Sequence, residues 1–293
     1  MRYPLTHTNW NKKEITAMQS VIKSGMFTMG KNVKKFEENF SKYLKKKYSV
    51  MVNSGSSANL LAISSLFYKK KNPLKRGDEV IVTAVSWSTT YAPLQQLGLK
   101  LKLVDIELNS FNIDIHLLKK AITKKTKLIV VVNLLGIPCD LNTIKKLCNK
   151  HKIILFEDNC ESMGALISNK KAGSFGKLSS HSFFFSHHMC TMEGGMISTD
   201  DFELYCILKS IRAHGWSRDL PKNNPLFKPK KNDFYEEYKF ILPGYNVRPG
   251  ELHGAIGNIQ LKKVKSFIKI RRQNLLLFNK LFEKNQKIII TNT

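Results

Sequence analysis

Short apolar runs, rich in β-branched residues, recur along the first 200 residues of the chain. Most of them are followed by a stretch with the spacing of a helix, for example near 114–123 and 140–150. The runs that predict strands are YSVMVNS (48–54), DEVIVTA (78–84), LKLVDIE (101–107), TKLIVVVNLLG (126–136), KIILFEDN (152–159), SSHSFFFS and GGMISTDD. Nearly continuous apolar strands that alternate with helices predict an α/β fold with a mostly parallel central sheet, covered on both faces.

The pattern changes after residue 215. A polar, proline-containing excursion follows, and a long helical pattern then begins near residue 250. We therefore expect a large α/β domain over residues 1–240, including an N-terminal segment 1–30, and a second unit over residues 241–293. The final IIITNT predicts the start of a strand, so this second unit is expected to be the beginning of an incomplete C-terminal small domain.

The composition predicts a globular protein without metal. Hydrophobic residues make up 42% of the chain, which is enough for a core. The five cysteines are scattered and form no C-x-x-C pair, so neither a disulfide framework nor a structural zinc site is expected. The N-terminus lacks the apolar segment of a signal peptide, and no run of 18 apolar residues occurs. We expect a cytoplasmic protein with no membrane insertion.

The net charge of +26 raises the question of an anionic partner. The excess is mostly lysine, distributed over predicted helix faces and loops, without the interleaved aromatic residues of a single-strand binding surface. We therefore expect a solvated basic surface and no specific nucleic-acid partner.

Several polar motifs follow the ends of predicted strands, where ligands bind in open α/β sheets. The motif NSGSSAN includes Gly55 and Ser56 at a predicted helix start. Free backbone N–H groups there form a phosphate site, although an ordinary serine cap has the same pattern. In GYNVRP, Asn246 and Arg248 lie on a predicted turn before a helix. Arg248 suits a carboxylate or a phosphate, or equally a surface ion pair.

Two further residues have properties that an aromatic, phosphorylated cofactor requires. Asp158 ends a buried strand, where a carboxylate needs compensation: either a protonated heteroaromatic nitrogen, or a helix cap or salt bridge. Trp87 offers a flat face for stacking, although an isolated tryptophan is more often a core residue. A phosphate cradle, a stacking ring and a strand-end aspartate, in this order, match the needs of pyridoxal 5′-phosphate (PLP).

From SGMFTMGKNVKKFEENF to GYNVRPGELHGAIGNIQL, the motifs resemble those of the sugar aminotransferases of DegT/DnrJ/EryC1/StrS type, which have the aspartate aminotransferase fold. The resemblance covers most of the chain. It implies that Trp87 stacks on the cofactor ring and that Asp158 pairs with the ring nitrogen. It places Glu161, where the family usually has glutamine, near the ring hydroxyl.

The resemblance also implies a shared active site. Gly55, Ser56 and Ser182 would hold the cofactor phosphate, and Asn246 would reach it from a neighbouring subunit. A homodimer is therefore expected.

The chain departs from the family at one position. Aminotransferases of this type read Ser-Phe-x-x-x-Lys, with Glu-Gly-Gly beginning six residues after the lysine. Counting five forward from Ser182 and six back from Glu193 gives the same residue, His187. Imidazole cannot form the covalent link to the cofactor that a lysine amine forms, but a neutral histidine can act as a general base.

This replacement resembles the sugar 3-dehydratases within the family. It implies removal of the C3 hydroxyl from a nucleotide-linked 4-keto-6-deoxyhexose, with GDP-4-keto-6-deoxy-D-mannose as the expected substrate. Pyridoxamine 5′-phosphate (PMP) would be the working cofactor, L-glutamate the amino donor and His187 the catalytic residue. His214 of RAHGW is expected near the substrate, with a structural hydrogen bond as the alternative.

Two other functions remain open on the sequence. One is a CDP-4-keto-6-deoxyglucose 3-dehydrase that needs an iron–sulfur cluster, which the scattered cysteines do not favour. The other is a ligand-binding homologue without catalytic activity, which the retention of the cofactor motifs does not favour.

Overall fold

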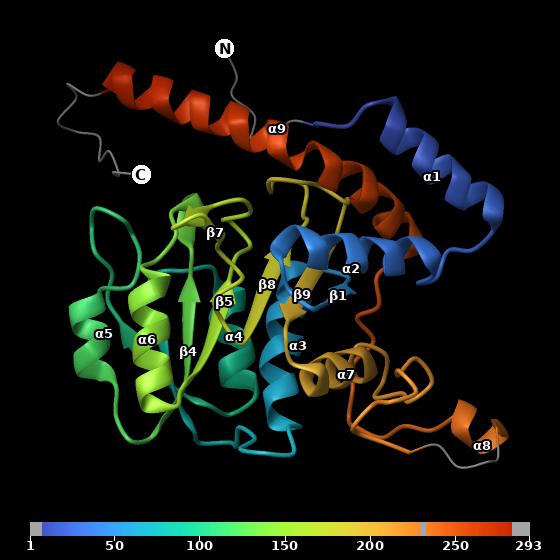
Figure 1. The fold of residues 1–293 in the computed structure, drawn as a ribbon, viewed down its shortest axis with the longest axis horizontal. Coiled ribbons are helices and arrows are strands. Elements are labelled where there is room, and N and C mark those ends of the chain that lie inside the picture. The colour runs from blue at the N-terminus through green and yellow to red at the C-terminus, as the bar shows by residue number, and fades with distance from the viewer. Residues whose placement is uncertain (1–7, 229–232, 283–293) are drawn as a thin grey trace.

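A seven-stranded sheet forms the centre of the protein in the computed structural model, which describes residues 8–228 and 233–282 (Figure 1). Its strands are β1 (Tyr48–Val52), β2 (Glu79–Thr83), β3 (Lys100–Val104), β4 (Thr126–Val132), β5 (Ile154–Asp158), β8 (Leu178–Ser182) and β9 (Gly195–Thr199). They lie in the order β1-β9-β8-β5-β4-β2-β3, and only β9 runs antiparallel to its neighbours. A separate hairpin joins β6 (Leu166–Ile167) and β7 (Lys170–Lys171). The predicted mostly parallel sheet is confirmed.

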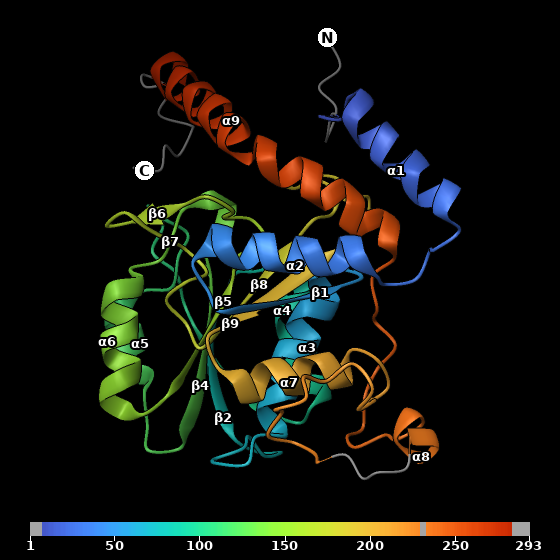
Figure 2. The ribbon, with the colours of Figure 1, turned by 45° about the vertical axis from the view of Figure 1, so that its right-hand side comes forward.

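Helices cover both faces of the sheet. They are α1 (Lys12–Ser24), α2 (Lys31–Leu44), α3 (Gly55–Phe67), α4 (Ser88–Gln96), α5 (Ile115–Ala121), α6 (Leu141–His151), α7 (Phe202–Ile211), α8 (Asp233–Glu237) and α9 (Glu251–Phe282), with a 3₁₀ turn, η1, at Leu134–Gly136. One face packs against α3, α4 and α7. The other packs against α5 and α6 at one end and against α2 and α9 at the other (Figure 2).

Successive side chains of a strand point to opposite faces of the sheet, so alternate residues of each strand belong to the cores on opposite faces. In β2, Val80 and Val82 belong to the core under α3 and α4, whereas Ile81 belongs to the core under α5 and α6. This two-sided burial explains why the strands read as nearly continuous apolar runs.

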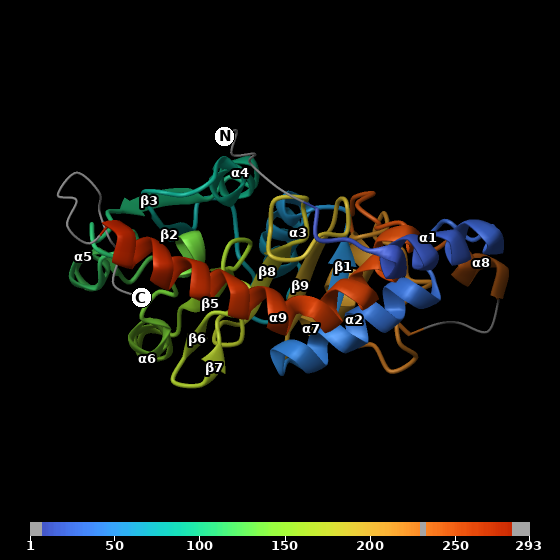
Figure 3. The ribbon, with the colours of Figure 1, turned by 90° about the horizontal axis from the view of Figure 1, so that it is seen from above.

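Helix α9 lies across the carboxyl ends of the parallel strands, as Figure 3 shows from above. Its first residue, Glu251, is buried and accepts hydrogen bonds from the backbone N–H groups of Gly30, Asn32 and Val33 at the start of α2. A carboxylate in this position satisfies free N–H groups and favours the positive end of the helix dipole. The expected boundary at residue 240 stays a prediction.

The long helical pattern after residue 250 is confirmed as α9, and α8 is the one helix described within the polar excursion after residue 215. The strand expected at IIITNT lies outside the described residues. Within residues 8–228 and 233–282, no helix combines the length and the apolar character needed to cross a membrane.

Candidate active site

Asp158 ends β5 as a buried carboxylate without an ion-pair partner in the described part of the chain. Three neutral donors hold it: the Asn59 amide and the Thr90 hydroxyl, each at 2.9 Å from Oδ2, and the Cys160 backbone N–H at 3.1 Å from Oδ1. These bonds fix the side chain but leave its negative charge uncompensated. A buried carboxylate in this state suits a cationic ligand atom.

The turn between β1 and α3 lies against the end of β8. Ser54 caps α3, accepting a hydrogen bond from Ser57 N at 3.1 Å. A Cβ atom on Gly55 would lie 2.5 Å from Ser182 Cβ and 2.8 Å from Ser182 Oγ, so only glycine allows this approach. The first turn of α3, with Ser56 exposed on it, and the Ser182 hydroxyl therefore form one cradle with the properties of a phosphate site.

Trp87 is not a core residue, because its side chain is 70% exposed. It lies just before α4, and its carbonyl accepts a hydrogen bond from Thr90, the residue that also holds Asp158. The exposed indole is thus on the same turn as a donor to the buried carboxylate.

His187 lies in the loop after β8, half-buried, in a tight turn in which its N–H donates to Phe184 O at 3.0 Å. Burial lowers the pKa of His187 below its usual 6.5, the carboxylates of Glu161 and Asp158 oppose this shift, and Arg271 on α9 adds to it. The imidazole is therefore neutral at pH 7 and lies within the electrostatic influence of both carboxylates.

The other two histidines of this segment are set apart by deeper burial. Burial lowers the pKa of His188 to about 4, with Arg271 and His187 adding to the effect. Burial likewise lowers the pKa of His181 to about 3, with a contribution from His188. No carboxylate contributes to the pKa shift of either residue, whereas Glu161 and Asp158 both act on His187.

Glu161 is half-buried and accepts a hydrogen bond from Leu135 N at 2.8 Å. It follows Asp158 in the same loop, so the structure brings together Gly55, Ser182, Asp158, Glu161 and His187 at the carboxyl ends of β5 and β8. These are the strand ends at which sheet topology predicts a ligand.

The segment that contains Asn246 and Arg248 is tied to the phosphate turn by Asn53 N, which donates to Val247 O at 3.0 Å. The Asn246 side chain is exposed and accepts a hydrogen bond from Arg248 Nε at 3.1 Å. His214 is exposed, and its N–H donates to Tyr245 O at 2.7 Å. Its backbone has a φ of 62°, in the left-handed region that favours glycine.

Sequence analysis missed the residues that hold the His187 loop in place. Cys190 N donates to Gln260 Oε1 on α9 at 3.2 Å, and Gln260 Nε2 donates to Glu14 Oε1 on α1 at 2.7 Å. Trp10 Nε1 donates to Cys190 O at 3.3 Å. Gln260 and Glu14 are fully buried, and no local pattern in the sequence marks either residue, because their contacts join distant parts of the chain.

These residues fit a phosphorylated pyridine cofactor. The cradle at Gly55 and Ser182 suits a phosphate, and the uncompensated Asp158 suits a protonated ring nitrogen. Within residues 8–228 and 233–282, no three histidine, cysteine or acidic side chains are grouped as a metal site requires.

Comparison with known proteins identifies relatives of the same architecture. The chain is 55% identical, over 99% of its own length and 74% of the relative, to a GDP-4-keto-6-deoxy-D-mannose 3-dehydratase of Yersinia pseudotuberculosis. A solved structure of such an enzyme, a His-to-Asn mutant with bound GDP-perosamine, superposes with a TM-score of 0.94 at 55% identity and covers 97% of this chain and 74% of that one. Another, with a trapped PLP-glutamate geminal diamine, gives a TM-score of 0.95 at 55% identity and the same coverage.

The family model for DegT/DnrJ/EryC1/StrS aminotransferases matches residues 9–293, which is nearly the whole chain. The aminotransferase fold predicted from the sequence is thereby confirmed. This chain belongs to the DegT/DnrJ/EryC1/StrS aminotransferase family.

Proposed function

We propose that this chain is a PLP/PMP-dependent sugar 3-dehydratase that removes the C3 hydroxyl from GDP-4-keto-6-deoxy-D-mannose, with L-glutamate as amino donor. The observation that carries the proposal is the neutral His187 beside Asp158 and Glu161, where transaminating members of the family have lysine. The relatives at 55% identity act on the GDP-linked sugar, which favours this substrate over the CDP-linked alternative.

Each site residue has a role in this proposal. Gly55, Ser56 and Ser182 would hold the cofactor phosphate, Trp87 would lie against the ring, and Asp158 would pair with its nitrogen. Glu161 would lie near the ring hydroxyl, while Arg248 and His214 would face the sugar nucleotide. When bound, the cofactor supplies an electron-withdrawing ring and, as PMP, an amine that reacts with the 4-keto group.

His187 supplies the proton transfers. Its neutral imidazole accepts a proton at pH 7, and the resulting imidazolium returns one to the hydroxyl that leaves C3. The nearby carboxylates of Asp158 and Glu161 stabilise the imidazolium between these two transfers. A histidine cannot bind the cofactor covalently, so this site favours elimination over a full transamination cycle.

The test combines the chain with PMP, glutamate and the GDP-linked ketosugar. We expect a product that lacks one oxygen, with release of ammonia and 2-oxoglutarate. His187→Asn should lower the rate by about 10²–10⁴-fold, the usual contribution of a general base, with PLP absorbance retained. His188→Asn is the matched control, expected to lose far less activity.

Three results would contradict the proposal. They are an aminosugar product, full activity of His187→Asn, and turnover that requires an added iron–sulfur reductase. Cofactor binding without any turnover of the sugar would instead support the non-catalytic alternative.

We further infer a cytoplasmic homodimer in which Asn246 completes the site of the neighbouring subunit. In its support, the Asn246 side chain is exposed while the backbone on either side is fixed: Ala213 pairs with Asn246, and Val247 N donates to Arg212 O at 3.1 Å. Mixing His187→Asn with Asn246→Ala subunits tests the arrangement. Shared sites would recover activity in mixed dimers, because one site is then intact, whereas self-contained sites would recover none.

A further inference from the structure

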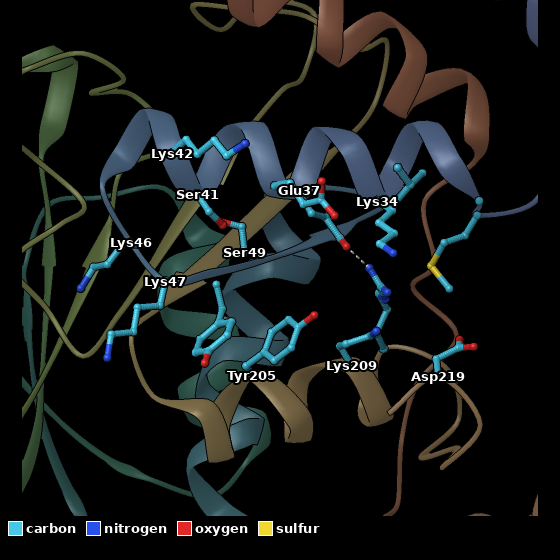
Figure 4. Close-up of a pocket in the computed structure, with 16 residues that line it drawn as sticks. Lys34, Glu37, Ser41, Lys42, Lys46, Lys47, Ser49, Tyr205, Lys209 and Asp219 are labelled. Atoms are coloured by element: carbon cyan, nitrogen blue, oxygen red, sulfur yellow. Dashed lines mark hydrogen bonds and ion pairs between the residues drawn. The ribbon is translucent and has the colours of Figure 1, made fainter. Parts of the chain in front are cut away.

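A cavity of about 460 Å³, apart from the candidate active site, lies between α2, the start of β1 and α7 (Figure 4). It opens beside Tyr48 and Ser49 at the amino end of β1, whereas the phosphate turn at Gly55 follows the carboxyl end of that strand. None of the residues assigned to the active site lines it. Its volume is within the range of small-molecule sites.

Basic side chains dominate the wall of this cavity. Two of its cations are already paired: Arg212 with Glu37 at 2.5 Å and Lys46 with Asp200 at 2.9 Å. Four more line it with no carboxylate within 4 Å in the described part of the chain: Lys34, Lys42, Lys47 and Lys209. Figure 4 shows Lys34 and Glu37 on α2 and Lys209 on α7, on opposite walls of the cavity.

Arg212 adds an unsatisfied donor. The residue is 2% exposed, and one guanidinium nitrogen binds Glu37 Oε1 and Met51 O. Its Nε is buried and has no hydrogen-bond acceptor among the described residues. Buried donors are almost always paired in proteins, and this unpaired one belongs to a residue that lines the cavity.

Lys209 is half-buried one turn before Arg212 on α7. Burial lowers the pKa of Lys209, and Arg212 adds to the effect, although Glu37 and Asp219 oppose it. An anion between Lys209 and Arg212 would offset both the desolvation and the repulsion. Two cations that lie close together on one wall distinguish this cavity from the remaining surface, where the lysines are scattered.

The aromatic wall indicates the kind of anion. Tyr48 and Tyr205 stack with ring centroids 4.6 Å apart and planes 17° apart, and both line the cavity. A lysine ammonium is a common phosphate ligand, and a tyrosine face accepts the apolar side of a sugar or a base. We propose that this cavity is a second ligand site, separate from the active site, that binds a small phosphorylated metabolite.

The test titrates inorganic pyrophosphate into the PLP-loaded chain by calorimetry at about 150 mM salt, where unspecific contacts with a basic surface are screened. We expect one saturable site per chain. Lys209→Gln and Lys34→Gln should each weaken binding about tenfold or more, the loss expected for one hydrogen bond to a charged group. Lys34 is exposed, so its replacement keeps the fold intact even if Lys209→Gln disturbs α7.

Matched controls separate this site from the overall charge and from the active site. Lys119→Gln with Lys120→Gln on α5 removes two charges far from the cavity and should leave the affinity unchanged. Arg248→Ala should also leave it unchanged. Three results would overturn the proposal: no saturable binding, an affinity in Lys34→Gln and Lys209→Gln that is unchanged from the unmodified chain, or loss of binding in Arg248→Ala alone.

Discussion

Glu157 and Asp158 are consecutive buried carboxylates on β5, and they are held in different ways. Glu157 is fully buried and accepts the backbone N–H groups of Gly173, Phe175 and Gly176. Asp158 points to the opposite face and is held by Asn59, Thr90 and the Cys160 N–H. Glu157 holds the loop at residues 173–176 in place. Asp158 is held by neutral donors, so its charge can still pair with a cationic group of a ligand.

The surroundings of the two carboxylates explain the difference. Burial raises the pKa of Glu157. Its three N–H donors and the charge of Lys46 offset part of this effect, so the local structure already meets part of the cost of burying its charge. Asp158 has no ion-pair partner in the described part of the chain, and its charge, like that of Glu161, raises the pKa of His187. A buried polar group thus indicates a ligand site when its bonds fix its position but leave its charge unmatched.

The strongest test of this comparison is Asp158→Asn. Breaking a buried charge pair costs about 3–5 kcal/mol, so PLP affinity should fall roughly 10²–10⁴-fold, while the cofactor-free protein keeps its unfolding free energy within about 1 kcal/mol. Absorbance titration with PLP and urea unfolding measure the two quantities. Unchanged PLP affinity would show that Asp158 is structural, like Glu157.

Glu157→Ala should give the reverse result. It leaves three buried N–H groups without an acceptor, at about 1–3 kcal/mol each, so the unfolding free energy should fall by about 3 kcal/mol or more. PLP affinity of the folded fraction should change little. A loss of affinity comparable to that of Asp158→Asn would remove the distinction between the two carboxylates.

A smaller effect is expected at the phosphate cradle. Gly55→Ala places a Cβ 2.5 Å from Ser182 Cβ, so the turn must move away from β8, and PLP affinity should fall about tenfold. Adding Ser182→Gly removes the clashing atom. The melting temperature of the double variant should therefore exceed that expected from the two single changes, and simple additivity would contradict the close contact.

The sequence predicts the strand ends and the candidate residues on them well, because their signals are local. The register of His187 follows from counting between Ser182 and Glu193, and Gly55 follows from a strand–glycine–helix pattern. Local patterns did not decide between stacking and core positions for Trp87; its 70% exposure excludes the core. Its contact with the cofactor stays a prediction.

The supports of the site could not be predicted, because they join distant parts of the chain. Asn59 and Thr90 reach Asp158 from separations of 99 and 68 residues, and Gln260 reaches Glu14 across 246. Nothing in a single sequence indicates which amide or hydroxyl meets a given carboxylate. Tertiary packing makes that choice.

The pH dependence of turnover gives the smallest and most specific test, because it detects the charges around His187. Its folded pKa is lowered below 6.5, so the neutral base is present above that pKa and is lost as the pH falls through it. The acid limb of kcat/KM should therefore lie below pH 6.5.

Glu161→Gln removes a charge that raises this pKa and should move the limb to lower pH, whereas Arg271→Met should move it to higher pH. Each shift should be less than about one unit, since screened charges near a protein surface interact by about 1 kcal/mol. Shifts of the same sign in both variants would show that His187 is not the group that titrates. Lys269→Met, which removes one positive charge from the same helix, is the control for Arg271→Met.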